Sequence, residues 1–333
     1  MFSKGKEFIW VTLLLSLVLL ALTGVAFADE KLKIDNVQIT CGAANGSWVR
    51  IGAAISEKAN EYFEGFPINA VPGPGSVANP SIVGTGQAHI GFTYPPFLHS
   101  AVKGEAPYED KFDNLKFVAS LTPTVVQFLS NLNQEGLTLE RIVENKIRIR
   151  LGLNPKGSGS HYILQMILQS NGVPEIEDIK KWGGNVYYAS GDGLSSAWQD
   201  RHINFMMFTD NVPSAAIEES VAGRGGYLIG IGDGFAANLS KLGFVPFTIQ
   251  SGTYSGQERE VKTVSLPLVV FAREDIDPKV IYYVTKSIYE NLEYFGDVHS
   301  SFKSLKQQDL YSNHGLEMHE GAKMYYKEIG VIE

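Results

Sequence analysis

Hydrophobic positions along the chain alternate between two spacings. Lys33–Thr40 alternates apolar and polar residues as a strand does, and residues 51–62 then repeat apolar positions every three or four residues, as a helix does. The same patterns predict strands at 68–73, 88–94, 116–121, 125–132, 146–153, 185–189, 203–208 and 263–272, and helices at 160–172, 194–199 and 278–295. Strands that alternate with helices are typical of the α/β class, with a mixed sheet flanked by helices.

Two similar lobes are predicted from two short segments of the chain that resemble each other. His89–Phe92 and His202–Phe205 each follow a helix and open a strand that ends in polar residues and proline. We place the first lobe at 29–124 plus 262–333 and the second at 125–261. No Pro/Gly/Ser-rich linker separates them, so strands that cross from lobe to lobe are expected rather than a flexible tether.

The first 28 residues have the features of a signal peptide. Lys4 and Lys6 precede an apolar run from Phe8 to Leu22, and Ala26-Phe27-Ala28 is a small-x-small cleavage site. We therefore expect export to the periplasm with cleavage after Ala28. An uncleaved membrane anchor is the alternative, although the apolar run is short for a span.

Charge and cysteine content exclude several classes of partner. Without residues 1–28 the chain has 26 basic and 35 acidic residues, a net charge of −9, which argues against nucleic acid and anionic lipid. Cys41 is the only cysteine, so no internal disulfide can form. The spacing of His314, Glu317 and His319 does not match a metal-binding helix, and no metal site is predicted.

Four loops, each between a strand and a helix, are the candidate ligand site. They lie within 39–55, 72–81, 154–162 and 209–216, and small or Ser/Asn residues stand where each helix begins. Ser47, Asn79, Ser160 and Asn211 are candidate N-caps, with Pro80 at the first helical position. Helix N-termini offer free backbone N–H groups and bind anions, and in a parallel sheet they meet at the carboxyl ends of the strands.

Nucleotide, cofactor and enzyme chemistry find little support. The loop "NPKGSGSHY" lacks the Gly-Lys-Ser/Thr ending of a phosphate loop, and no GxGxxG follows the first strand. No cofactor and no catalytic residue are predicted. The alternative function is a periplasmic hydrolase that uses a serine of the GSGS loop, but this loop is not the nucleophile elbow GxSxG.

Several longer motifs resemble the TAXI-type solute receptors of tripartite ATP-independent periplasmic (TRAP) transporters. They are "CGAANGSWVRIGAAI", "PGPGSVAN", "GQAHIGFTYP", "GLNPKGSGSHYILQMIL", "SGTYSGQEREVKTVSLPLVVFARED" and "GLEMHEGAKMYYKEIGV", in order over nearly the whole mature chain. The resemblance implies a two-lobed, type II-like periplasmic binding protein that closes on an organic anion, such as a dicarboxylate, an oxoacid or an acidic amino acid. It also implies delivery of that ligand to an ion-coupled TRAP permease, and we expect a monomer.

The resemblance and the loop positions together give the predicted ligand-binding residues. Ser47, Ser76, Ser158, Ser160 and Tyr254 match the family pattern. Trp48, Arg50 and Tyr94 stand at pocket-lining positions, with Trp48 and Arg50 where the family usually has Thr-Tyr-Tyr-Pro and Tyr94 where it usually begins Gln-Ser-Asp. The loops add Asn79, Gly159, Thr209, Asp210 and Asn211. We expect Trp48 to pack on the apolar part of the ligand and Arg50 to pair with a carboxylate.

Overall fold

The computed structural model describes residues 31–333 except 43, 45, 133 and 135. The predicted signal peptide and its cleavage site lie outside the described residues. Among the residues described, no helix is both long and apolar enough to cross a membrane.

One ten-stranded mixed sheet organises the fold, in the order β2-β1-β3-β10-β4-β7-β5-β6, with β8 paired to β4 and β9 to β10. Its strands are β1 (Val37–Thr40), β2 (Ile68–Val71), β3 (Ile90–Thr93), β4 (Leu115–Ser130), β5 (Arg150–Leu153), β6 (Asn185–Tyr188), β7 (Phe205–Asp210), β8 (Tyr227–Ile229), β9 (Val245–Ile249) and β10 (Val261–Arg273). A parallel group β2-β1-β3 lies at one end and a parallel group β7-β5-β6 at the other. The predicted α/β class with a mixed sheet is confirmed.

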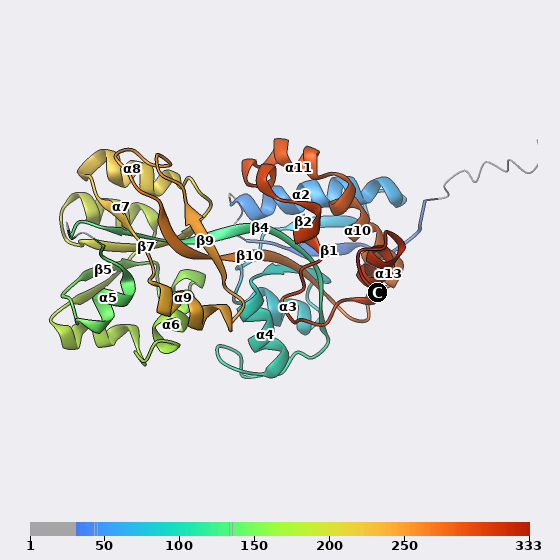
Figure 1. The fold of residues 1–333 in the computed structure, drawn as a ribbon. Helices are drawn as coiled ribbons and strands as arrows, with labels where there is room; N and C mark the ends of the chain where they lie inside the picture. Colours follow the sequence, from blue (N-terminus) through green and yellow to red (C-terminus); the bar gives the residue numbers. More distant parts are fainter. Residues whose placement is uncertain (1–30, 43, 45, 133, 135) are drawn as a thin grey trace, which may run out of the picture.

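Helices cover both ends of the sheet (Figure 1). They are α2 (Ser47–Ala59), α3 (Asn79–Gly84), α4 (Pro95–Lys103), α5 (Leu139–Glu144), α6 (Gly159–Gln169), α7 (Gly191–Gln199), α8 (Ala215–Arg224), α9 (Asp233–Ser240), α10 (Pro278–Glu290), α11 (Leu292–Val298), α12 (Gln307–Leu310) and α13 (Glu320–Glu328), with 3-10 turns η1 (Asn60–Tyr62), η2 (Ile176–Trp182) and η3 (Ser300–Ser304). Helices α5–α9 lie with β5 and β7, whereas α2, α10, α11 and α13 lie with β1 and β2 (Figure 1).

The long strands β4 and β10 run antiparallel through the middle of the sheet and join its two ends (Figure 1). Pro123 of β4 stands opposite Pro267 of β10, and the register shifts just beyond this pair. Because proline has no backbone N–H, neither residue can donate to the ladder there. The hydrogen-bonded ladder is therefore weakest where the chain passes from one end of the sheet to the other.

The structure corrects several predicted boundaries. The strands predicted on either side of Pro123 are one strand, β4, because a proline is tolerated at a break in ladder pairing. The helix predicted at 278–295 is two helices that meet at Asn291. The first strand begins only at Val37, since Lys33–Asn36 has no ladder partner.

The N-cap residues in the structure also differ from the predicted ones. Gly46 caps α2 and Ala78 caps α3, so Ser47 and Asn79 are the first helical residues and Pro80 the second. Ser158 caps α6 in place of Ser160, and its hydroxyl accepts a hydrogen bond from the His161 amide. Helix α8 begins after Ser214 rather than after Asn211.

Candidate functional site

A cavity of about 410 Å³ lies where the carboxyl ends of the parallel strands from both ends of the sheet meet. The loop after β1 and the loop after β2 form one wall, and the loop after β5 with the end of β7 forms the other. The predicted residues that line it are Ser47, Trp48, Ser76, Tyr94, Ser158, Gly159, Ser160 and Thr209. The volume is within the range of small-molecule sites.

Two helix N-termini face this cavity from opposite walls. Helix α2 begins at Ser47, and its N-cap residue, Gly46, has no side chain that could cap it. Helix α6 begins at Gly159, where the Ser158 hydroxyl accepts from the amide of His161 and from no earlier amide. The first amides of both helices have no intrahelical acceptor, so they are available to a bound anion.

Aromatic side chains form an apolar corner of the cavity. The Trp48 ring packs edge-on against Tyr94 at a centroid distance of 5.4 Å and against Phe92 at 6.1 Å. The Tyr94 hydroxyl donates to Thr124 Oγ1 at 3.1 Å, and burial raises its pKa to about 12. Tyr94 therefore stays protonated and offers an aromatic face rather than a charge.

Hydroxyl groups line another part of the cavity. Ser160 Oγ lies 2.8 Å from Thr209 Oγ1 and accepts from Asn154 Nδ2 at 3.2 Å. Asn154, which sequence reasoning missed, lies directly after β5, and its position at a strand end is the signal that could have found it. Ser76 is only 8% exposed, and among the described residues its hydroxyl has no hydrogen-bond partner.

The two walls touch each other around the cavity. A Cβ atom placed on Gly159 would lie 2.8 Å from Ser76 Oγ, so the glycine allows this close approach. Phe97 of α4 meets Tyr162 of α6 edge-on at 6.4 Å, and a Cβ on Gly243 would lie 3.3 Å from Pro95 Cβ. These contacts join residues on opposite sides of the β4–β10 crossing.

Asn79 is placed outside the cavity. It is fully buried, and its Nδ2 donates to the carbonyl of Cys41 at 2.6 Å and to that of Phe92 at 2.8 Å. Its Oδ1 accepts from Thr40 Oγ1 at 3.2 Å. The amide side chain thus ties the ends of β1 and β3 together beneath the first wall.

Asp210 and Tyr254 also lie outside the cavity, in a network that holds the loop after β7. The Tyr254 hydroxyl accepts from the Ser214 amide at 2.7 Å and donates to Gln127 Oε1 on β4. The Asp210 carboxylate accepts from the amide of Asn211 and from Ser214 Oγ, both at 2.8 Å. This network fixes the segment that ends β7 and places Thr209 in the cavity.

Arg50 and Asn211 lie beyond the cavity near His299. Arg50 is exposed and is not among the lining residues. Asn211 Nδ2 lies 3.4 Å from His299 Nε2, a contact between the loop after β7 and the segment after α11. Burial lowers the pKa of His299; the charge of Arg50 lowers it further and that of Asp210 raises it. Both charges therefore lie close to this imidazole.

Neither serine of the GSGS loop has a base in contact with it among the residues described. Ser158 Oγ accepts a backbone amide, and Ser160 Oγ contacts only Asn154 and Thr209. The His161 ring instead packs against Tyr162 and Tyr188. Residues 31–333, with the four gaps given above, contain no cluster of three His, Cys, Asp or Glu side chains suited to a metal ion.

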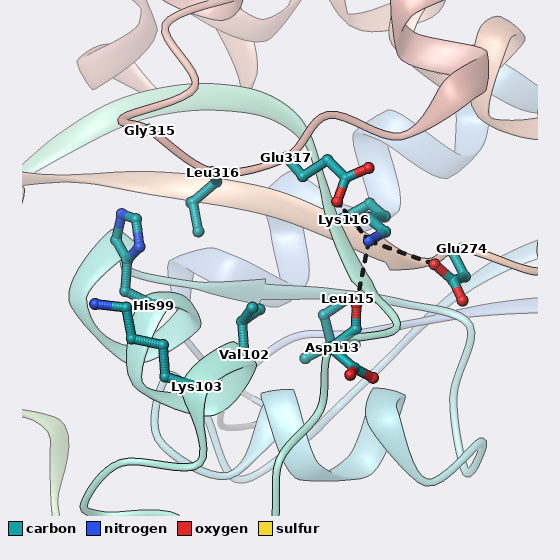
Figure 2. Close-up of a pocket in the computed structure, with 10 residues that line it drawn as sticks. All are labelled: His99, Val102, Lys103, Asp113, Leu115, Lys116, Glu274, Gly315, Leu316 and Glu317. Atoms are coloured by element: carbon teal, nitrogen blue, oxygen red, sulfur yellow. Dashed lines mark hydrogen bonds and ion pairs between the residues drawn. The ribbon is translucent and has the colours of Figure 1, made fainter.

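A second cavity, of about 610 Å³, lies on the surface between α4 and the C-terminal segment (Figure 2). Lys116 points toward Glu317 and Glu274 and forms ion pairs with them at 2.8 and 3.4 Å (Figure 2). Its Nζ also donates to the Asp113 carbonyl at 3.1 Å. Because this lysine already has three oxygen partners, it is not free to hold an anion, and the smaller cavity is the candidate site.

Comparisons agree with this architecture. The sequence model of the NMT1-like family matches residues 39–330. The chain belongs to the NMT1-like family. This NMT1-like protein is similar in fold to XAC2383 from Xanthomonas citri, solved bound to ATP, with a TM-score of 0.51, 11% identity, and 90% of this chain and 96% of that chain covered.

Two further solved structures match with lower scores. A TctC solute binding protein from Polaromonas has 11% identity, covers 90% of this chain and 99% of its own, and gives a TM-score of 0.46. The periplasmic aliphatic sulphonate binding protein SsuA from Escherichia coli has 13% identity, covers 82% of this chain and 80% of its own, and gives a TM-score of 0.44.

Proposed function

We propose that this protein is an extracytoplasmic solute-binding receptor that captures a small organic anion and delivers it to the membrane subunits of an ion-coupled TRAP permease. The observation that carries this proposal is the cavity that lies between the N-termini of α2 and α6. Membership of the NMT1-like family and the names of the solved structures of similar fold support a receptor. The TRAP permease rests on the sequence resemblance.

An anion is favoured by the donors that the cavity presents. Free amides at two helix N-termini and several hydroxyls surround the space, whereas the protein as a whole carries a net charge of −8. The global field repels anions, so local donors must supply the binding free energy. Trp48 and Tyr94 offer surface for the apolar part of the ligand.

Capture proceeds by closure of two lobes, which we place at 29–124 plus 262–333 and at 125–261. The contacts of Ser76 with Gly159 and of Phe97 with Tyr162 belong to the closed state. Opening rotates the lobes about β4 and β10, where the Pro123–Pro267 pair interrupts the ladder. A ligand bound between the walls strengthens closure because it contacts both of them.

The export prediction completes the proposal. The apolar run 8–22 and the Ala26-Phe27-Ala28 site favour secretion across the inner membrane with release of the mature chain at Asp29. The absence of a base beside Ser158 and Ser160 among the described residues favours a receptor over the serine hydrolase considered above.

A melting-shift screen of organic acids against the chain from Asp29 tests the proposal. We expect at least one acid to raise the melting temperature, because a ligand that binds only the folded state stabilises it. The acid should be recovered unchanged by mass spectrometry, and the protein should elute as a monomer. Recovery of a hydrolysed product would favour the enzyme, and a full screen without any shift would contradict the receptor assignment.

A further inference from the structure

The charge of the cavity is set by its backbone rather than by side chains. Among the described residues that line it there is no Asp, Glu, Lys, Arg or His. Tyr94 is its only ionisable side chain, and its raised pKa keeps it neutral. Any counter-charge for an anion inside the cavity must therefore come from the helix termini.

The positive charge to which the two helix N-termini are equivalent can be estimated. A helix N-terminus is equivalent to about half an elementary charge, so α2 and α6 together offer about one. Helix α2 has 13 residues and α6 has 11, long enough for the dipole to develop in each. The cavity is electrostatically matched to one negative charge and has no counter-charge for a second.

An unpartnered hydroxyl inside the cavity points to a ligand independently of the helices. Ser76 is 92% buried and lines the cavity, yet among the described residues its Oγ has no hydrogen-bond partner. It lies across from Gly159, the first residue of α6. Because no group of the described chain occupies this hydroxyl and Ser76 lines the cavity, its Oγ is available to donate a hydrogen bond to a ligand there.

Arg50, Lys156 and Asp210 stand close in sequence to lining residues but do not line the cavity themselves. Lys156 pairs with Glu177 at 3.1 Å. Arg50 and Asp210 both act on His299 outside the cavity, and they shift its pKa in opposite directions. Asp210 also acts on Tyr94, whose pKa its charge raises, so its field reaches the aromatic corner. A second anionic group of a ligand would meet a carboxylate field there and not a cation.

We propose that this site selects singly charged organic anions over dianions. The inference rests on the proposed function, whose substrate class it narrows. One carboxylate lies between the N-termini of α2 and α6 and accepts from Ser76, and the uncharged body of the ligand packs on Trp48. A dianion of the same size would bury its second carboxylate without a partner, which costs free energy.

Isothermal titration of matched acid pairs tests the proposal. The pairs are pentanoate with glutarate, 2-oxopentanoate with 2-oxoglutarate, and 2-hydroxybutyrate with malate, and each pair differs mainly by a methyl group in place of a second carboxylate. We expect the monoanion to bind about tenfold tighter or more in every pair that binds. Equal or tighter binding of the dianions would overturn the inference while the receptor assignment stands.

Two serine variants report whether the carboxylate lies where we place it. Ser76→Ala should weaken binding of the best monoanion by at least about tenfold, the low end of the loss for a hydrogen bond to a charged group. Ser81→Ala, on α3 outside the cavity, is the matched control and should leave the affinity unchanged.

Glutarate binding that exceeds pentanoate binding and is lost in Arg50→Ala would overturn the proposal, because Arg50 would then hold a second carboxylate. Failure of all six acids would overturn this inference, and the full melting-shift screen decides the receptor assignment separately.

Discussion

The substitution Gly159→Ala should weaken ligand binding without lowering the stability of the folded protein. Gly159 is the first residue of α6, and a Cβ atom there would lie 2.8 Å from Ser76 Oγ on the opposite wall. In the open form that we propose, the two walls lie apart and this clash is absent. Alanine also favours a helix over glycine by about 0.5–1 kcal/mol, and Gly159→Ala should leave the free energy of unfolding unchanged or slightly raised.

The expected loss of affinity follows from the size of the clash. Ser76 can relieve part of it by turning its hydroxyl to another rotamer, so we place the cost at the low end of overpacking, about 1 kcal/mol. This corresponds to about fivefold in Kd for the best acid of the screen, measured by isothermal titration. Gly159→Val, with two more methyl groups, should lose considerably more.

Two controls make the result decisive. Gly191 is the first residue of α7 and has no atom within 4 Å of an added Cβ, so Gly191→Ala should show the helix effect alone. In a double-mutant cycle, Ser76→Ala combined with Gly159→Ala should lose less affinity than the two single losses added together. Parental affinity in Gly159→Ala, or additive losses in the cycle, would refute the closed contact.

Other variants test the buried networks. Tyr254→Phe leaves the Ser214 amide and Gln127 Oε1 unpaired and should lower the free energy of unfolding in urea by about 1–3 kcal/mol, whereas Tyr227→Phe, at a 50% exposed tyrosine, should not. Asn79→Asp replaces a donor to two carbonyls by an acceptor and should lower the melting temperature even without ligand; an unchanged melt would contradict its structural role. Burial also lowers the pKa of several histidines below 6.5, so stability should be full above that pH and fall as pH drops through the lowered values; equal melting temperatures at pH 7.5 and 5 would contradict this. These histidines are His89, His161, His299, His314 and His319.

The periodic parts of the chain could be predicted because the spacing of apolar residues indicates both the type of secondary structure and which of its faces is buried. Alternation around Val37–Thr40 and the helical spacing from Ile51 to Ala59 depend only on which face meets the core. The break predicted at Pro123 was wrong because whether a strand continues past a proline depends on the residue that it pairs with, which here is far away in sequence. Only the pairing with Pro267 shows that β4 continues past its proline.

The residues of the candidate site also fall into those that local sequence predicts and those that depend on distant neighbours. Serines and glycines directly after strands could be placed, because the carboxyl ends of parallel strands converge. Asn79 and Tyr254 could not, since a polar side chain near a loop serves a buried network as readily as a cavity, and the choice depends on neighbours such as Cys41 and Gln127. The rotation of α2 that leaves Arg50 exposed depends on how the helix packs.

The position of β10 between β3 and β4 has a consequence for how the chain matures. During synthesis the N-terminal strands emerge first, but residues 90–93 of β3 must wait for residues 269–272 before that side of the strand is paired. By contrast, β4, β5, β6, β7 and β8 are complete by residue 229. Such distant pairing slows folding, and an unpaired strand edge is a template for aggregation. We therefore expect the part of the sheet formed by β4–β8 to assemble first, and a chain that ends before β10 to be recognised by chaperones and proteases.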